Sequence, residues 1–235
     1  IIPDFAYKKE QKKNKNNTFP LKLNPGQEII FDWRQKRTGW LYISGKGNIE
    51  YQIASDLQIF ELFDSEMVSE KTFKGDFWPS YCAYKARGQY ILKPEKSFIE
   101  KKSNALRYLK VKNPGRESIT INFLSLKPSE FPSRPSGSFQ CSDKLINTGW
   151  QMGIDTVHLC TQPGDQSNIP VYGPFGDGYV QWDGCRRDRE IWGGDLRPAA
   201  LAWYYNFQDQ TPIANSLYVI MNAQHCGCDE HGIFP

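Results

Sequence analysis

The sequence predicts a multi-domain β + α protein in which a β-sandwich precedes a helical region. Three observations lead to this fold class. Between residues 20 and 127, short runs of β-forming residues alternate with turn residues. A segment rich in proline and serine follows at 128–138. Beyond it, apolar residues recur every three or four positions, which is the period of a helix.

Six strands are expected in the first region, at 28–33, 39–44, 48–53, 90–92, 106–111 and 118–124. In 106–111 and 118–123 apolar and polar residues alternate, as in a sheet with one buried and one solvated face. The run Gly45-Lys46-Gly47 predicts a hairpin between the second and third strands. This spacing of strands indicates a β-sandwich at 20–127, after a polar N-terminal segment at 1–19.

The segment 128–138 is predicted to be a linker, because its three prolines exclude helix and interior strand. Ser142 is expected to cap a helix that follows it. One stripe of this helix would carry Leu145, Ile146, Trp150, Gly153, Ile154 and Val157. Helical periodicity then predicts a second helix at 196–207, with Pro198 in its first turn.

A third helix is expected to begin with Thr211 as N-cap and Pro212 at the first helical position. Four apolar side chains of this helix are expected to face inward: Ile213, Leu217, Ile220 and Met221.

Composition excludes several classes of protein. The 29 basic and 26 acidic residues give a net charge of +3, which does not favour nucleic-acid binding. The polar run at 8–17 is expected to be solvated. No apolar stretch approaches the roughly 18 residues that a membrane-spanning helix needs. Six cysteines in 235 residues do not predict a disulfide scaffold.

Residues 182–195, here called the acidic motif, hold four carboxylates, three arginines and two tryptophans. Carboxylates among arginines can take different protonation states, because cations lower a carboxyl pKa and burial raises it. A tryptophan face packs against the C–H face of a sugar, while acids bind its hydroxyls. The motif therefore indicates a sugar site, with a surface turn held by ion pairs as the alternative. It is expected to lie in a loop that leads into the helix at 196–207.

Three segments follow the linker in order: Phe139-Gln140-Cys141-Ser142-Asp143-Lys144-Leu145-Ile146-Asn147, the helical run 156–162, and the motif D-G-x-x-R-D-R…W-x-G-D at 183–195. Together with the preceding β-sandwich and linker, this order resembles glycoside hydrolase family 78, the α-L-rhamnosidases. The similarity is most specific at 139–205. It implies a β-sandwich joined to an (α/α)6 barrel that begins at 139–235. It also implies hydrolysis of terminal α-L-rhamnose with inversion, without cofactor or metal. A periplasmic or secreted location is slightly favoured over a cytoplasmic one.

The resemblance assigns a role to five residues of the motif. Asp188 matches the general acid that protonates the leaving oxygen. Asp183 and Asp195 match carboxylates that hold rhamnose hydroxyls, and Arg187 would orient them or balance their charge. Trp192 would line the pocket against the apolar face of the sugar. A general acid must stay protonated until it is used, which burial or nearby negative charge favours.

An inverting mechanism also needs a base about 6.5–9.5 Å from the acid. The resemblance places this base on a glutamate further along the barrel, and neither Glu190 nor Glu230 is a confident substitute. About 95 residues follow the linker, too few for the twelve helices of a closed barrel. The chain is therefore expected to be a partial one that is inactive alone, with a missing segment supplying the rest of the barrel. Its expected ligand is a rhamnose-containing oligosaccharide or glycoside, with no nucleic-acid or membrane partner.

Other interpretations remain open. The run 225–231 contains two histidines and two cysteines, but its spacing matches zinc sites poorly, so a loop is expected there. The glycine-rich run 172–178 lacks the Lys-Ser/Thr of a phosphate loop. His158 is expected to pack in a core or an interface. The alternative functions are a non-catalytic carbohydrate-binding protein, another (α/α)-barrel glycosidase, or a polysaccharide lyase. The motif favours hydrolysis over a lyase, since it has carboxylates and no histidine.

Overall fold

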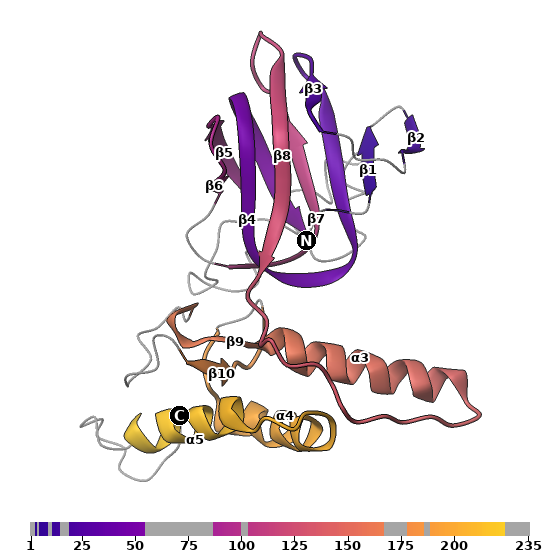
Figure 1. Ribbon diagram of the computed structural model, residues 1–235, viewed down its shortest axis with the longest axis vertical. Coiled ribbons are helices and arrows are strands. Elements are labelled where there is room, and N and C mark those ends of the chain that lie inside the picture. The colour runs from indigo at the N-terminus through magenta and orange to yellow at the C-terminus, as the bar shows by residue number, and fades with distance from the viewer. Residues whose placement is uncertain are drawn as a thin grey trace. The chain divides into compact units, whose positions relative to one another are not determined.

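The computed structural model describes residues 3, 5–8, 11–14, 19–54, 87–99, 103–166, 178–185 and 189–223, and Figure 1 labels their helices and strands. The contacts within the chain divide it into two compact units, with the boundary between Pro128 and Ser129. The first unit contains strands and the second contains all the described helices.

The described strands of the first unit are β1 (Phe5–Lys8), β2 (Gln11–Asn14), β3 (Leu21–Leu23), β4 (Glu28–Ala54), β5 (Arg87–Leu92), β6 (Ser97–Phe98), β7 (Asn104–Lys112) and β8 (Ile119–Pro128). All of the strand pairs among them are antiparallel. Antiparallel sheets bury one face and solvate the other, which agrees with the alternation that the sequence shows.

Strand β4 is 27 residues long and contributes to both layers of the unit. Its first part, 28–32, pairs with β1 and β7, and its last part, 50–54, pairs with β7 again. Its middle part, 39–46, pairs with β8 instead. Figure 1 shows β4 curving around one end of the domain between these two sets of partners. Arg34, with φ at 64°, lies within this bend. The result is a β-sandwich-like domain built around one bent strand.

The hairpin predicted at Gly45-Lys46-Gly47 is wrong, because β4 continues through these residues. Residues 39–46 pair with β8 and residues 47–52 pair with β5, so the two flanking segments have different partners. The register of β4 against β8 shifts between Ser44 and Gly45. A Cβ at Gly45 would overlap the Thr120 carbonyl oxygen, and Gly47 has a φ of 113°. Gly45 and Gly47 therefore allow β4 to be irregular and to lie close to β8, and they do not form a tight turn.

The core of the first unit lies between its two layers. Ile119 and Ile121 of β8 are buried in it, and after a break in the alternation at 122–123, where the register against β4 shifts, so are Leu124 and Leu126. The other large members are Leu23, Ile29, Phe31, Trp33, Leu41, Ile43, Ile49, Tyr51, Ile53, Leu106, Leu109 and Val111. The alternation expected in 118–123 is confirmed only as far as Ile121, because Phe123 is not on the buried face. The alternation expected in 106–111 is wrong at Tyr108 and Leu109, which are adjacent and both buried.

The second unit contains α3 (Lys144–Cys160), β9 (Thr161–Pro163), the 3-10 helix η1 (Gly164–Gln166), β10 (Tyr179–Gln181), α4 (Gly193–Asn206) and α5 (Thr211–Ala223). Strands β9 and β10 form a small antiparallel sheet. The buried Trp203 is central in the core of this unit. Its ring stacks on Phe207, with ring centroids 3.9 Å apart, and meets Phe131 edge-on at 5.8 Å. The Trp203 indole N–H donates to the Asp209 carbonyl at 2.7 Å.

The proline-rich segment after β8 is packed onto the second unit. The Phe131 N–H donates to the Thr161 carbonyl at 3.1 Å, and His158 Nε2 is hydrogen-bonded to the Phe131 carbonyl at 2.7 Å. Further along, the backbone N–H groups of Ser136 and Gly137 both donate to the Asn206 carbonyl, at 2.7 and 3.2 Å. His158 also stacks on Phe207, so its interpretation as a packing residue is confirmed.

The helix positions correct three details of the sequence analysis. Asp143, and not Ser142, caps α3: its Oδ1 accepts the N–H groups of Leu145 and Ile146 at 2.7 and 3.4 Å. Helix α4 begins at Gly193, three residues earlier than expected. Helix α5 already includes Thr211, which was expected to be its N-cap.

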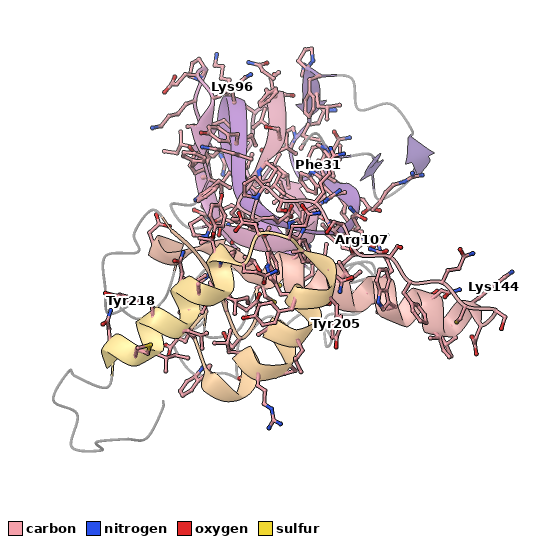
Figure 2. The ribbon with its side chains drawn as sticks, turned by 60° about the horizontal axis from the view of Figure 1, so that its bottom comes forward. Phe31, Lys96, Arg107, Lys144, Tyr205 and Tyr218 are labelled. Carbon is pink, nitrogen blue, oxygen red and sulfur yellow. The ribbon has the colours of Figure 1, made fainter. Side chains whose placement is uncertain are left out.

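The expected inward face of α5 is only half right. Ile213 and Ile220 are buried, but Leu217 and Met221 are 47% and 58% exposed. These two side chains line an apolar groove of about 410 Å³ between α4 and α5. Figure 2 labels Tyr205 on α4 and Tyr218 on α5, which are exposed as well. Within the described part of the chain, no helix is long and apolar enough to cross a membrane.

Candidate sugar-binding site

The described residues of the acidic motif lie between β10 and α4, at 182–185 and 189–192, and in the first turn of α4, at 193–195. Both flanks of this loop are fixed in the core of the second unit, through the buried side chains of Trp182 and Ile191. The backbone N–H of Trp182 donates to the Cys160 carbonyl at 2.9 Å, which connects the start of the loop to the end of α3. Rigid flanks of this kind are what a loop needs in order to hold catalytic or binding side chains.

Asp183 and Glu190 close the base of the loop with two hydrogen bonds, here called the Asp183–Glu190 bracket. The Asp183 N–H donates to the Glu190 carbonyl at 2.9 Å, and the Glu190 N–H donates to Asp183 Oδ1 at 3.1 Å. The carboxylate of Asp183 is half-buried. One of its oxygens is therefore held in place by a backbone donor, which fixes the orientation of the carboxylate.

Arg189 lies inside this loop with its side chain fully buried. Its Nε and Nη2 both donate to the Cys185 carbonyl, each at 3.2 Å. Its backbone adopts a φ of 54°, in the left-handed region that non-glycine residues rarely occupy. The sequence analysis treated this arginine only as a charge close to the carboxylates.

Trp192 and Asp195 lie at the start of α4. Trp192 is the residue before the helix and is 36% exposed, and its carbonyl accepts the Leu196 N–H at 2.8 Å. Asp195 is half-buried in the first turn. The positive end of the helix dipole is a favourable place for a negative charge. An exposed indole next to a carboxylate is an arrangement that suits a sugar ring.

The structure thus brings three of the five candidate residues to one loop and the helix that follows it. These are Asp183, Trp192 and Asp195. The other two, Arg187 and Asp188, lie outside the described residues, as does the histidine- and cysteine-containing run 225–231. Among the described residues, no group of three His, Cys, Asp or Glu side chains is close enough to hold a metal ion.

Sequence reasoning missed the Asp183–Glu190 bracket and the burial of Arg189. The bracket joins two residues that are seven positions apart, through one bond between backbone groups and one from a backbone N–H to a carboxylate oxygen. No side-chain pattern reports such a contact. An arginine flanked by acidic residues usually predicts a surface ion pair, because arginine is rarely fully buried. Only the fold around it shows that this one is buried.

Tyr179, in the strand before the motif, is a poor candidate for a general base. Burial, and then the negative charge of Asp165, raise the pKa of Tyr179 above its ordinary value of 10.0. Its ring packs edge-on against Phe131, with centroids 5.0 Å apart. The phenol therefore stays protonated near neutral pH, which argues against a lyase that uses this tyrosine as its base.

No family model and no curated protein matches the chain. Solved structures do. A rhamnosidase from Klebsiella oxytoca with rhamnose bound is similar with a TM-score of 0.62 and 16% identity, over 94% of this chain and 43% of that chain. A GH78 family rhamnosidase of Bacillus sp. GL1 is similar with a TM-score of 0.58 and 19% identity, over 86% of this chain and 19% of that chain.

The chain shares the fold of the matching parts of these two rhamnosidases. The resemblance stated from the sequence is therefore confirmed for the fold. Similarity at 16% and 19% identity shows the fold alone. The chain spans less than half the length of either of these rhamnosidases.

Proposed function

We propose that the chain is part of an inverting glycosidase that releases terminal α-L-rhamnose from glycans or glycosides. The main support is the coincidence of two independent observations. The fold matches that of a rhamnosidase with rhamnose bound over 94% of the chain. The acidic motif, which alone indicated a sugar site, lies on a loop fixed in the core of the second unit. In this proposal α3, α4 and α5 are the first helices of an (α/α)6 barrel.

Each candidate residue has a part in the proposed mechanism. Asp188 protonates the leaving glycosidic oxygen as general acid, and Arg187 orients or balances the neighbouring carboxylates. Asp183 and Asp195 accept hydrogen bonds from rhamnose hydroxyls. The half-exposed Trp192 presents its ring to the apolar face of the sugar. The bracket on Asp183 supports its part, since a fixed carboxylate loses little entropy when it binds a hydroxyl.

The proposed reaction also needs a general base, which we place outside these 235 residues. An inverting glycosidase activates water with a second carboxylate about 6.5–9.5 Å from the acid. Both rhamnosidases of similar fold are more than twice as long as the part that this chain matches. The chain alone is thus expected to bind rhamnose without hydrolysing glycosides. Turnover of an aryl α-L-rhamnoside by the purified chain would contradict this.

Calorimetric titration with L-rhamnose tests the sugar site. The wild-type chain is expected to bind, and Asp183→Ala with Asp195→Ala is expected to weaken binding at least about tenfold, the usual cost of losing charged hydrogen-bond partners. Asp155→Ala is the matched control, because this carboxylate is exposed on α3, where it accepts a hydrogen bond from the Gln151 side-chain amide at 2.9 Å.

The sugar itself supplies a second control. L-Mannose carries one hydroxyl more than L-rhamnose, in place of a hydrogen of its methyl group, so a site shaped for rhamnose should bind it more weakly. Equal affinity of the double variant and the wild type for L-rhamnose would refute the assignment of Asp183 and Asp195. A wild-type chain that binds neither sugar would refute the proposal that these residues form a sugar site in this chain.

A further inference from the structure

Arg189 combines two features that each cost free energy. Its guanidinium is fully buried, although a buried charge is tolerated only where hydrogen bonds or opposite charges compensate it. Its φ of 54° is a left-handed conformation that is unfavourable for a residue with a Cβ. Strained residues of this kind concentrate where the surrounding structure holds them for a functional reason.

The orientation of the Arg189–Glu190 peptide explains what this conformation achieves. This peptide contains the Glu190 N–H, which donates to Asp183 Oδ1 at 3.1 Å. The backbone angles of Arg189 decide where that N–H points, because they rotate the chain immediately before it. On the other side, the Arg189 side chain is held by Nε and Nη2 on the Cys185 carbonyl, only two residues after Asp183.

We propose that Arg189 is a positioning residue for Asp183. Its guanidinium, bound to the Cys185 carbonyl, holds the Arg189 backbone in the left-handed conformation, and that conformation aims the Glu190 N–H at the Asp183 carboxylate. A forked guanidinium suits this task, because two of its N–H groups can share one acceptor in a fixed plane, whereas the ammonium of lysine cannot. The value of this positioning for rhamnose binding rests on the proposed function, but the positioning itself does not.

Amide hydrogen exchange measured by NMR tests the positioning directly. Arg189→Met removes the donors while keeping a long side chain in the buried space. It is expected to raise the exchange rates of the Asp183 and Glu190 amides at least about tenfold, as the bracket opens more often. The Phe207 amide, which donates to the Trp203 carbonyl at 2.8 Å at the end of α4, is the internal reference and should keep its rate. Arg197→Met is the matched control, because Arg197 is exposed on α4.

Arg189→Lys keeps the charge and loses the fork. It is expected to behave like Arg189→Met, and it decides the question if the methionine variant does not fold. Wild-type exchange rates of both bracket amides in Arg189→Lys would overturn the proposal.

Rhamnose titration of the same variants supplies the functional readout. If Asp183 binds the sugar, Arg189→Lys should lower the affinity at least about tenfold under conditions in which the variant is still folded, so that the lost affinity reports on positioning and not on unfolding. Unchanged affinity in a variant whose bracket amides exchange fast would overturn the link to binding. A wild-type chain that binds no rhamnose would count against the proposed function alone, because the exchange rates still decide the role of Arg189.

Discussion

Gly137→Ala should detach the proline-rich segment from the second unit. A Cβ at Gly137 would overlap the Tyr205 carbonyl oxygen and come within 2.9 Å of Asn206 Oδ1, and backbone atoms cannot move aside easily. The segment would have to withdraw and would lose the two backbone hydrogen bonds that Ser136 and Gly137 donate to the Asn206 carbonyl. At about 0.5–1.5 kcal/mol each, these bonds predict a destabilisation of about 1–3 kcal/mol.

Gly149→Ala is the matched control, because the same chemical change should have the opposite sign there. Gly149 lies inside α3 and a Cβ would meet nothing within 4 Å. Replacing a helical glycine by alanine stabilises by about 1 kcal/mol. Urea unfolding followed by tryptophan fluorescence would measure both variants, and exchange mass spectrometry of the peptide 129–138 would locate the change. Wild-type stability and wild-type exchange of this peptide in Gly137→Ala would refute the reasoning.

Two further predictions concern the starts of helices. Asp143→Ala should destabilise the second unit by about 0.5–2 kcal/mol in thermal unfolding, because the cap of α3 is lost. Ser142→Ala should leave the stability within about 0.5 kcal/mol of the wild type. A larger loss of stability in Ser142→Ala than in Asp143→Ala would show that Ser142 is the cap. Hydrogen bonds from Thr211 to the carboxylate of Asp209, first from its side chain and then from its backbone N–H at 2.9 Å, lower the pKa of Asp209 below its ordinary 3.8. A lowered pKa in the folded state means that the contribution to stability is present above pH 3.8 and is lost as the pH falls through the folded value. The Thr211 amide shift should therefore titrate with a midpoint below 3.8, and a midpoint at or above it would contradict this assignment.

The strands were predictable where one face is buried. In β8 the alternation of Ile119 and Ile121 with polar residues reports directly which face meets the core, but the pattern breaks at Phe123, an apolar residue that is not buried. The partners of a strand are not encoded in the same way. Glycines at 45 and 47 predicted a local turn, yet they serve contacts with β8, more than 70 residues away in the sequence. A local pattern cannot distinguish a glycine that turns the chain from one that admits a distant strand.

The helices were found, but their buried faces were less well predicted. Periodicity located α3, α4 and α5 because the 3.6-residue repeat is a property of the helix alone. Periodicity also predicted that Leu217 and Met221 face inward. In the structure these side chains are instead partly exposed and line the groove between α4 and α5. An apolar residue on a helix indicates that the position favours burial, without stating which neighbour buries it. Caps are equally ambiguous where two capping residues are adjacent, as Ser142 and Asp143 are.

For the candidate site, the sequence predicted which residue types are present but not how they are arranged. The sequence indicated the chemistry of a sugar site, because it places carboxylates, arginines and tryptophans together within fourteen residues. It also located Asp195 correctly, since a helix period begins directly after it. It did not predict the bracket on Asp183 or the burial of Arg189, both of which depend on the backbone conformation of the loop.

The loop has a defined shape because its flanks belong to the same core as the helices. Trp182 and Ile191 pack in one cluster with Leu196, Trp203 and Phe207. The bracket lies between these two buried flanks, so the close-packed interior limits how far Asp183 and Glu190 can move apart. The packing of these apolar side chains therefore restrains both ends of the proposed sugar site, and the polar residues of the motif determine its local geometry. This explains how a loop without regular secondary structure can keep a carboxylate oriented for a ligand.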